Sequence, residues 1–238
     1  MPECRVTLST NAGVSLEFKT KKIWVDAVSD SNPMGFSFLT QGMWEQMKGD
    51  ERFANPDVIC FTHCHGDHFS EKYTREAVEM WPEAKVIIPE QFLEGQILVE
   101  EDALIPIDRS LNIEYQRLQH EGTLFRDSIH YGILIEYYGY TVLIPGDCSV
   151  GSEELEKWIG KRRINAVLLD FPWITSEAGR KYVAEVIQPE YAIVCHLPRA
   201  GNDRFGYREA TKKGIELLNK DITALLLSED FTSVFLKW

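Results

Sequence analysis

The chain has 238 residues and a formal net charge of −12, which disfavours nucleic acid as the main partner, because nonspecific affinity for phosphates comes from Lys and Arg. Hydrophobic residues make up 44% and charged residues 26%, the composition of an ordinary globular protein with a sizeable core. No apolar run approaches the length of a bilayer-spanning helix, the N-terminus has no signal-type segment, and the five cysteines lack disulfide-type spacing, so we expect a cytoplasmic protein with no membrane partner.

The first part of the chain predicts short strands followed by a less regular segment. The predicted strands are residues 5–9, 14–18 and 23–28. The last two flank a basic turn, which suits a hairpin. Residues 29–56 show a weaker pattern, a loop with one short helix, and their aromatic residues Phe36, Phe38 and Trp44 either wall a pocket or belong to the core.

A dense group of metal-binding residue types follows a short apolar run: His63, His65, Asp67 and His68. Alternate residues of an extended segment share a face, so His63 and His65 project together, and Gly66 lets the chain turn Asp67 and His68 back toward the same space. Three of the six histidines fall in this segment, which argues against unrelated exposed loop residues. Because a zinc ion takes about four ligands, the segment predicts a metal site with further ligands from elsewhere.

Predicted helices and strands then alternate to the end of the chain. The predicted helices are residues 70–80, 153–159, 177–187 and 208–219. The predicted strands are residues 85–89, 112–120, 131–136, 141–144, 164–170 and 191–196, with two more within 223–238. The acidic stretch 94–102 is interpreted as a solvated face. The same pattern occupies both halves and no linker divides them, so we expect a single α/β domain over residues 1–238, a four-layer αββα sandwich.

The pattern His63-x-His65-x-Asp67-His68 resembles the signature of the metallo-β-lactamase-fold hydrolases, and the resemblance extends over nearly the whole chain. It implies the αββα sandwich of the metallo-β-lactamase type and a centre with two divalent metal ions, zinc before manganese or iron. The metal ligands that the resemblance implies are His63, His65, Asp67, His68, His120, Asp147 and His196. One ion would take the first two histidines with His120, and Asp147 would bridge the two ions.

Two of these ligands and one supporting residue resemble residues of the family in their positions relative to predicted strands. Asp147 follows a hairpin and a Pro-Gly pair and resembles the bridging aspartate of the family, and His196 ends a strand as its final histidine does. The resemblance implies a catalytic role for the carboxylates of Asp67 and Asp147. Asp26 resembles the residue that braces the histidine loop, and the alternative is a plain turn at the end of a strand.

The histidine ligand between the motif and Asp147 has two candidates. His120 ends a predicted strand and precedes a glycine-containing loop, as the ligand of the family does, whereas His130 begins the next strand. We favour His120 and keep His130 as the alternative.

Four residues are candidates for contacts with the substrate. Arg199 and Arg204 follow His196 in a loop together with Tyr207, and a guanidinium there can hold a carboxylate or phosphate in a bidentate pair. The alternative for this loop is a solvated surface. Trp173 covers the pocket in one interpretation and belongs to the core or the surface in the other.

The resemblance implies a dinuclear hydrolase in which a hydroxide bridging the two metals attacks an ester, lactone, amide or phosphoester bond of a small molecule. An RNA-processing nuclease or phosphodiesterase of the same fold is an alternative, which the acidic net charge makes less favourable for RNA. A noncatalytic scaffold that binds a metal or ligand is the alternative from a different class of protein.

Overall fold

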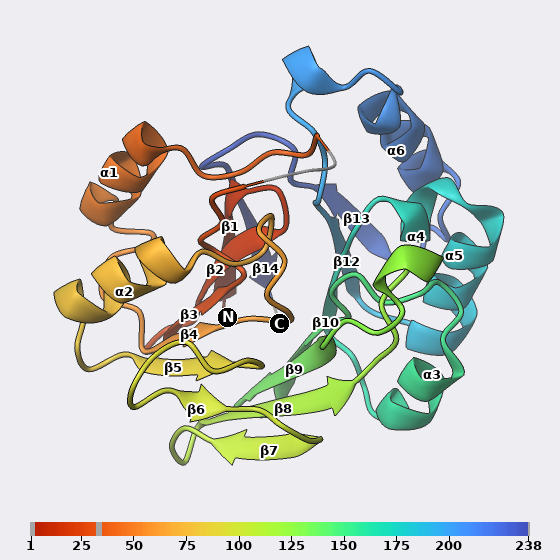
Figure 1. Ribbon diagram of the computed structural model, residues 1–238. Coiled ribbons are helices and arrows are strands. Elements are labelled where there is room, and N and C mark those ends of the chain that lie inside the picture. The colour runs from red at the N-terminus through yellow and green to blue at the C-terminus, as the bar shows by residue number, and fades with distance from the viewer. Residues whose placement is uncertain (1–2, 32–34, 238) are drawn as a thin grey trace. The chain divides into compact units, whose positions relative to one another are not determined.

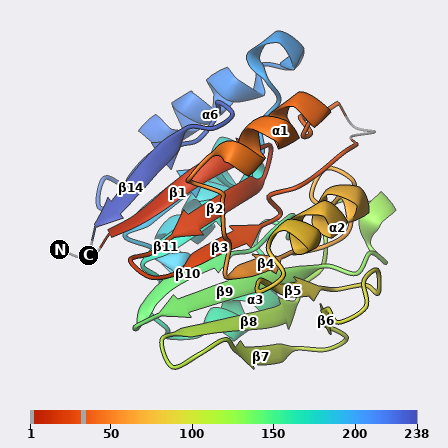
Figure 2. The same ribbon diagram turned by 90° about the vertical axis from the view of Figure 1, so that its left-hand side faces the viewer.

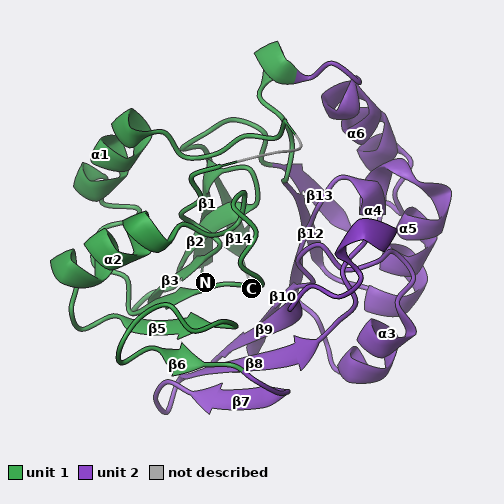
Figure 3. Cartoon of the chain, in the orientation of Figure 1, with its two compact units in different colours: residues 1–99, 196–202, 227–238 green, residues 100–195, 203–226 purple. Residues whose placement is uncertain are grey.

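The structure is a computed structural model that describes residues 3–31 and 35–237, and its contacts divide the chain into two compact units. Unit 1 comprises residues 1–99, 196–202 and 227–238, and unit 2 comprises residues 100–195 and 203–226 (Figure 3). None of the described helices is both long enough and apolar enough to cross a membrane.

Unit 1 is built on a seven-stranded sheet in the order β14-β1-β2-β3-β4-β5-β6 (Figure 1). Its strands are β1 (Glu3–Thr10), β2 (Gly13–Glu17), β3 (Lys22–Val25), β4 (Val58–Cys60), β5 (Lys85–Ile88), β6 (Ile97–Leu98) and β14 (Ser233–Lys237). Neighbours from β14 to β3 are antiparallel, and neighbours from β3 to β6 are parallel. The carboxyl ends of β3 and β4 therefore lie side by side, which brings the residues that follow them together.

The helices α1 (Gln41–Gly49) and α2 (Glu71–Met80) lie over one face of this sheet (Figures 1 and 2). A hydrophobic core joins them to the strands through large side chains such as Trp24, Trp44 and Phe61. Helix α2 begins where the sequence predicts, because the hydroxyl of Ser70 accepts a hydrogen bond from the backbone N–H of Tyr73 at 3.2 Å. The short 3₁₀-helix η3 (Ala200–Asn202) also belongs to this unit.

Unit 2 has a second seven-stranded sheet, in the order β13-β12-β11-β10-β9-β8-β7. Its strands are β7 (Ala103–Pro106), β8 (Leu111–Arg117), β9 (Tyr131–Tyr137), β10 (Tyr140–Ile144), β11 (Ala166–Leu169), β12 (Tyr191–Val194) and β13 (Thr223–Leu226). Neighbours from β7 to β10 are antiparallel, and neighbours from β10 to β13 are parallel. The sheet thus repeats the plan of the sheet in unit 1.

The helices of unit 2 also gather on one face of their sheet (Figure 1). They are α3 (Glu153–Ile159), α4 (Pro172–Thr175), α5 (Glu177–Tyr182), the π-helix η2 (Val183–Ile187) and α6 (Tyr207–Glu216), and the short 3₁₀-helix η1 (Thr123–Phe125) lies in the connection between β8 and β9. Leu155 of α3, Ile174 of α4 and Val183 of η2 pack in one core with strand residues of the same unit. The predicted α/β class is confirmed, and the single domain over residues 1–238 stays a prediction.

Several predicted boundaries are wrong for local reasons. Strand β3, predicted over residues 23–28, ends at Val25, because Asp26 adopts a left-handed φ of 51°. The acidic stretch 94–102 contains β6, a strand of two residues that is too short to show an alternating pattern. Strand β8 ends at Arg117, which pairs with the first residue of β9, so His120 lies beyond the regular ladder.

Candidate metal centre

Asp26 directly follows β3 and holds the start of the histidine segment. Its backbone N–H donates to the carbonyl of Cys60 at 3.0 Å. Its buried carboxylate accepts hydrogen bonds from the backbone N–H of Thr62 at 2.7 Å and from the Thr62 hydroxyl at 2.6 Å. The same carboxylate lies 2.9 Å from Nδ1 of His68. Asp26 therefore braces the histidine segment, as the resemblance implies, and is more than a turn at a strand end.

These hydrogen bonds determine which nitrogen of each imidazole carries a proton. The one proton of the Thr62 hydroxyl goes to the Asp26 carboxylate, so this hydroxyl accepts from Nδ1 of His63, 3.0 Å away. Nδ1 of His68 donates to the same carboxylate. Neutral His63 and His68 are thereby left with a lone pair on Nε2, which is the form in which histidine binds a metal.

Asp67, His68 and His196 bring three possible ligand atoms together within unit 1. Nε2 of His68 lies 3.1 Å from Nε2 of His196, which lies 3.6 Å from Oδ2 of Asp67. One ligand atom from each residue lies within 4.8 Å of the others, and both histidines are buried. Two imidazole nitrogens and a carboxylate oxygen at this spacing fit the donor sets of zinc, iron and manganese.

His63 and His65 complete the histidine segment. The ring centroid of His63 lies 4.5 Å from that of His65 and 4.1 Å from that of His68. The turn between them closes through the backbone N–H of His68, which donates to the carbonyl of His65 at 2.9 Å. The three imidazoles of the segment therefore converge in one place.

Gly66 allows this turn to pack against the loop that follows β3. The Gly66 carbonyl accepts hydrogen bonds from the backbone N–H groups of Asp30 at 3.1 Å and Ser31 at 3.2 Å. A Cβ atom at residue 66 would lie 2.0 Å from the hydroxyl oxygen of Ser31. Only glycine fits this approach without displacing Ser31.

His196 is held in a left-handed backbone conformation, with φ 57°. Its backbone N–H donates to the carbonyl of Asn11 at 2.8 Å, and the Asn11 side-chain amide donates to the carbonyl of Asp67 at 3.2 Å. Sequence reasoning did not identify Asn11, because an asparagine between two predicted strands indicates only a turn. Its connection to two candidate ligands becomes visible only in the folded chain.

The aromatic residues of the segment 35–44 separate into two groups. The ring of Phe36 lies 4.8 Å from the imidazole of His196 at an angle of 61°, so it contacts a candidate ligand. Trp44 is completely buried in the core of unit 1 and donates to the carboxylate of Glu76 at 2.5 Å. Phe36 therefore lies beside the candidate centre, and Trp44 belongs to the hydrophobic core.

In unit 2, His120 lies beside Asp147. Its Nε2 is 3.6 Å from Oδ2 of Asp147, and its Nδ1 donates to the carbonyl of Glu121 at 2.7 Å. The backbone N–H of Glu121 donates to the carbonyl of Asp147 at 2.7 Å, which holds the two segments together. His130 is completely buried, and its Nδ1 donates to the carbonyl of Leu118 at 3.1 Å. This geometry favours His120 over His130 as the ligand.

Two cysteines next to candidate ligands, Cys64 and Cys148, lie where burial disfavours the thiolate form. Burial raises the pKa of the Cys148 thiol to about 12, and burial also raises the pKa of the Cys64 thiol. A metal binds the thiolate, which these environments disfavour. Within residues 3–31 and 35–237, no group of possible metal ligands includes a cysteine.

The guanidinium of Arg199 bonds to other parts of unit 1. Its Nε donates to Oδ2 of Asp230 at 2.7 Å, and an Nη donates to the carbonyl of Phe38 at 3.1 Å. Its backbone N–H donates to the hydroxyl of Ser37 at 3.1 Å. Arg199 therefore fastens the segment of Phe36 to the loop that follows His196, and its contact with a substrate stays a prediction.

Trp173 is corrected, because its side chain is completely buried in the core of unit 2 and offers no surface to a substrate. Arg204 is exposed, and Tyr207 begins α6 with its ring stacked on Phe171 at a centroid distance of 4.4 Å. Arg204 and Tyr207 stay predictions as contacts with a substrate.

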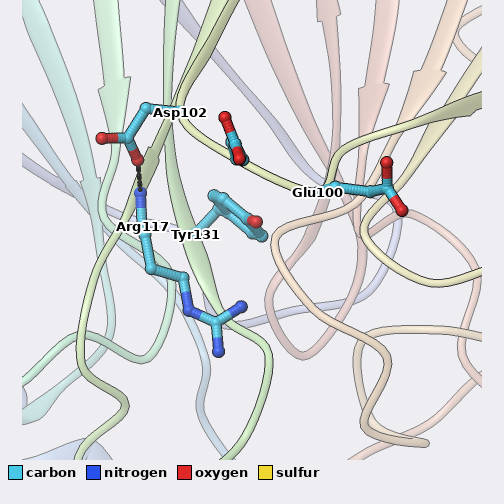
Figure 4. Close-up of a pocket in the computed structure, with 5 residues that line it drawn as sticks. Glu100, Asp102, Arg117 and Tyr131 are labelled. Carbon is cyan, nitrogen blue, oxygen red and sulfur yellow. Dashed lines mark hydrogen bonds between the residues drawn. The ribbon is translucent and has the colours of Figure 1, made fainter.

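Unit 2 has an open hollow of about 420 Å³ that none of the candidate ligands lines. It is bordered by three acidic side chains, by Arg117 and by Tyr131. Figure 4 shows the carboxylate of Asp102 bonded to the backbone N–H of Arg117 at 2.7 Å, and the Arg117 guanidinium lies 5.3 Å from the ring of Tyr131. This hollow is therefore not the candidate centre.

Solved structures with the same fold are found across nearly the whole chain. Igni18, a metallo hydrolase from the archaeon Ignicoccus hospitalis, matches with a TM-score of 0.71 and 16% identity over 99% of both chains. The metallo-β-lactamase fold protein YhfI from Bacillus subtilis matches with a TM-score of 0.67 and 11% identity over 99% of this chain and 100% of its own.

CmlA, a diiron β-hydroxylase from Streptomyces venezuelae, matches with a TM-score of 0.66 and 15% identity over 98% of this chain and 54% of its own. No protein-family model matches the sequence, and a search of curated proteins found no match either. At these identities the similarity shows the fold, which is that of the metallo-β-lactamases.

Proposed function

We propose that this chain, which has the metallo-β-lactamase fold, is a metal-dependent hydrolase of small molecules with two divalent metal ions. The observation that carries the proposal is the cluster of Asp67, His68 and His196, in which both histidines are buried and the possible ligand atoms lie within 4.8 Å of one another. Buried histidines gathered this closely with a carboxylate, and with a second aspartate that orients one imidazole, are typical of metal sites.

The ligands that we propose within unit 1 are His63, His65, Asp67, His68 and His196. His120 and Asp147, which belong to unit 2, stay predictions as ligands. The donor set of nitrogen and oxygen is suited to zinc and also to iron or manganese. Because CmlA, a diiron hydroxylase, has the same fold, the test includes loading the protein with iron.

The protein's own groups prepare this site for a cation. Asp26 and Thr62 fix the protonation of His63 and His68 so that Nε2 carries the lone pair. The carboxylates of Asp67 and Asp147 offset the charge of a bound cation, and a carboxylate beside the reacting bond can accept a proton. A divalent metal bound here supplies Lewis-acid chemistry, polarising a carbonyl or phosphoryl oxygen and lowering the pKa of water.

The substrate class that we propose is a small molecule with an ester, lactone, amide or phosphoester bond. The net charge of −12 disfavours RNA as the substrate. Phe36, next to His196, gives the site an apolar border, which suits an organic group beside the scissile bond.

The test combines metal analysis of the purified protein with hydrolysis of a panel of esters, lactones, amides and phosphodiesters. We expect two metal ions per chain, and hydrolysis that a chelator abolishes and that zinc, manganese or iron restores. His68→Ala should lose metal and activity, whereas Glu94→Gln, at an exposed residue of the same unit, should change neither. A metal-loaded wild-type protein that cleaves no member of the panel would overturn the proposal.

A further inference from the structure

Asn11 lies in the turn between β1 and β2 and is only 2% exposed. Its φ of 53° is left-handed, a conformation that asparagine adopts more readily than most residues. A turn residue is usually exposed, so the burial of a polar asparagine at this point calls for partners inside the protein.

Those partners are the backbones of two candidate ligands. The Asn11 carbonyl accepts the backbone N–H of His196 at 2.8 Å, and its side-chain Nδ2 donates to the carbonyl of Asp67 at 3.2 Å. One residue therefore holds both the main chain that carries His196 and the main chain that carries Asp67.

The two backbones need such a connection, because the two ligands are far apart in the sequence. His196 also has a left-handed φ of 57°, a conformation that is uncommon for residues other than glycine and persists where the surroundings enforce it. The bond to Asn11 stabilises this conformation. The side chains that it places, Asp67 and His196, have Oδ2 and Nε2 3.6 Å apart.

We propose that Asn11 is a positioning residue that sets the spacing of Asp67 and His196, and thereby the affinity of the metal site that these residues form with His68. The inference rests on the proposed function only in taking these three residues as metal ligands. Asn11 itself binds no metal in this proposal and acts through the two backbones.

The chain offers a matched pair of substitutions. Asn11→Gly keeps the left-handed backbone and the carbonyl that binds His196, and it removes only the side-chain bond to Asp67. Asn55, in the same unit, has a left-handed φ of 57° and is exposed, so Asn55→Gly makes the same chemical change away from the site. Asn11→Asp keeps the shape of the side chain and removes its N–H donors.

The experiment titrates the metal-free proteins with zinc against a chelating indicator and with Co²⁺, following the visible absorption of the bound ion. We expect Asn11→Gly and Asn11→Asp to bind one ion about 10- to 100-fold more weakly than the wild type, the range found when a group supporting a ligand is removed. The Co²⁺ spectrum of that site should change in intensity, and Asn55→Gly should match the wild type in both measurements.

Two outcomes would overturn the inference. The first is a wild-type affinity and Co²⁺ spectrum in Asn11→Gly or in Asn11→Asp, because the bond to Asp67 would then set nothing. The second is loss of folding in both variants, measured by circular dichroism, because the residue would then serve the fold as a whole.

The readout separates this inference from the proposed function. If the wild type binds two ions and hydrolyses nothing, the proposed function fails and the role of Asn11 stands. If His196→Ala loses an ion while Asn11→Gly and Asn11→Asp bind that ion with wild-type affinity, the role of Asn11 fails and the metal centre stands.

Discussion

At the scale of single residues, hydrogen bonds to the imidazoles determine which ring nitrogen is available to a metal. Asp26 orients His68 directly and His63 through Thr62, and in unit 2 the carbonyl of Glu121 orients His120. In each case the bond occupies Nδ1 and leaves the lone pair on Nε2. The residue type alone predicts a ligand, and these partners decide which nitrogen is available to a metal.

The choice between His120 and His130 gives the first prediction. We expect His120→Ala to lose one metal ion per chain, because its Nε2 lies 3.6 Å from the carboxylate of Asp147. His130→Ala should keep two ions and lose about 1–3 kcal/mol of stability, because its buried imidazole fills space and bonds to the Leu118 carbonyl. Metal content by elemental analysis and unfolding by urea measure both effects, and the reverse pattern of metal loss would assign the ligand to His130.

At the scale of elements, the two sheets repeat one plan, with an antiparallel set followed by parallel strands. Asp26 follows β3 and Asp147 follows β10 closely, at corresponding places of the two sheets. The sequence shows alternating strands and helices in both halves, from which the α/β class could be predicted. The match of strand order could not, because it depends on which strands pair.

The start of α2 supports the histidine segment, and this gives the second prediction. The Ser70 hydroxyl caps α2 and also donates to the carboxylate of Asp30 at 2.5 Å, next to the loop that holds the Gly66 carbonyl. Ser70→Ala should therefore cost about 1 kcal/mol of stability and also weaken metal binding. Thr40 caps α1 in the same way, so Thr40→Ala should cost a similar stability with unchanged metal affinity. Equal metal affinities in the two variants would show that the bond to Asp30 does not reach the centre.

An ion pair in unit 1 gives a prediction of pH dependence. The Arg52 guanidinium, which also donates to the carbonyl of Phe231, holds the pKa of the Asp50 carboxyl below its usual value of 3.8. A folded-state pKa below the unfolded value stabilises the protein at pH values above the unfolded pKa, and this contribution is lost as the pH falls through the folded pKa. We expect Asp50→Asn to lower the free energy of unfolding by about 1 kcal/mol at pH 7. Below about pH 4, the free energy of unfolding should decrease less steeply with falling pH in this variant than in the wild type. Urea unfolding from pH 2.5 to 7 measures this, and Asp127→Asn, at an exposed residue, is the control.

At the scale of the whole molecule, the proposed ligands come from segments that are distant in the chain, so metal binding should stabilise the folded state. A ligand present at about 1,000 times its Kd adds about 4 kcal/mol per site. Since 1 kcal/mol raises Tm by about 2–4 °C in a protein of this size, removal of the metals by a chelator should lower Tm by about 10 °C or more. Differential scanning calorimetry with and without chelator checks this, and an unchanged Tm would contradict a metal centre in the folded protein.

The sequence by itself determined the α/β class and the histidine segment, because periodicity and ligand spacing are local properties of the chain, and the family resemblance supplied the other candidate ligands. Only the tertiary structure showed that His120 lies beside Asp147, that Trp173 is buried in a core, and that Asn11 connects to Asp67 and His196. These distinctions depend on burial and on hydrogen bonds between residues far apart in the sequence. A local sequence pattern cannot predict these contacts, because they form only when strands from distant parts of the chain end side by side.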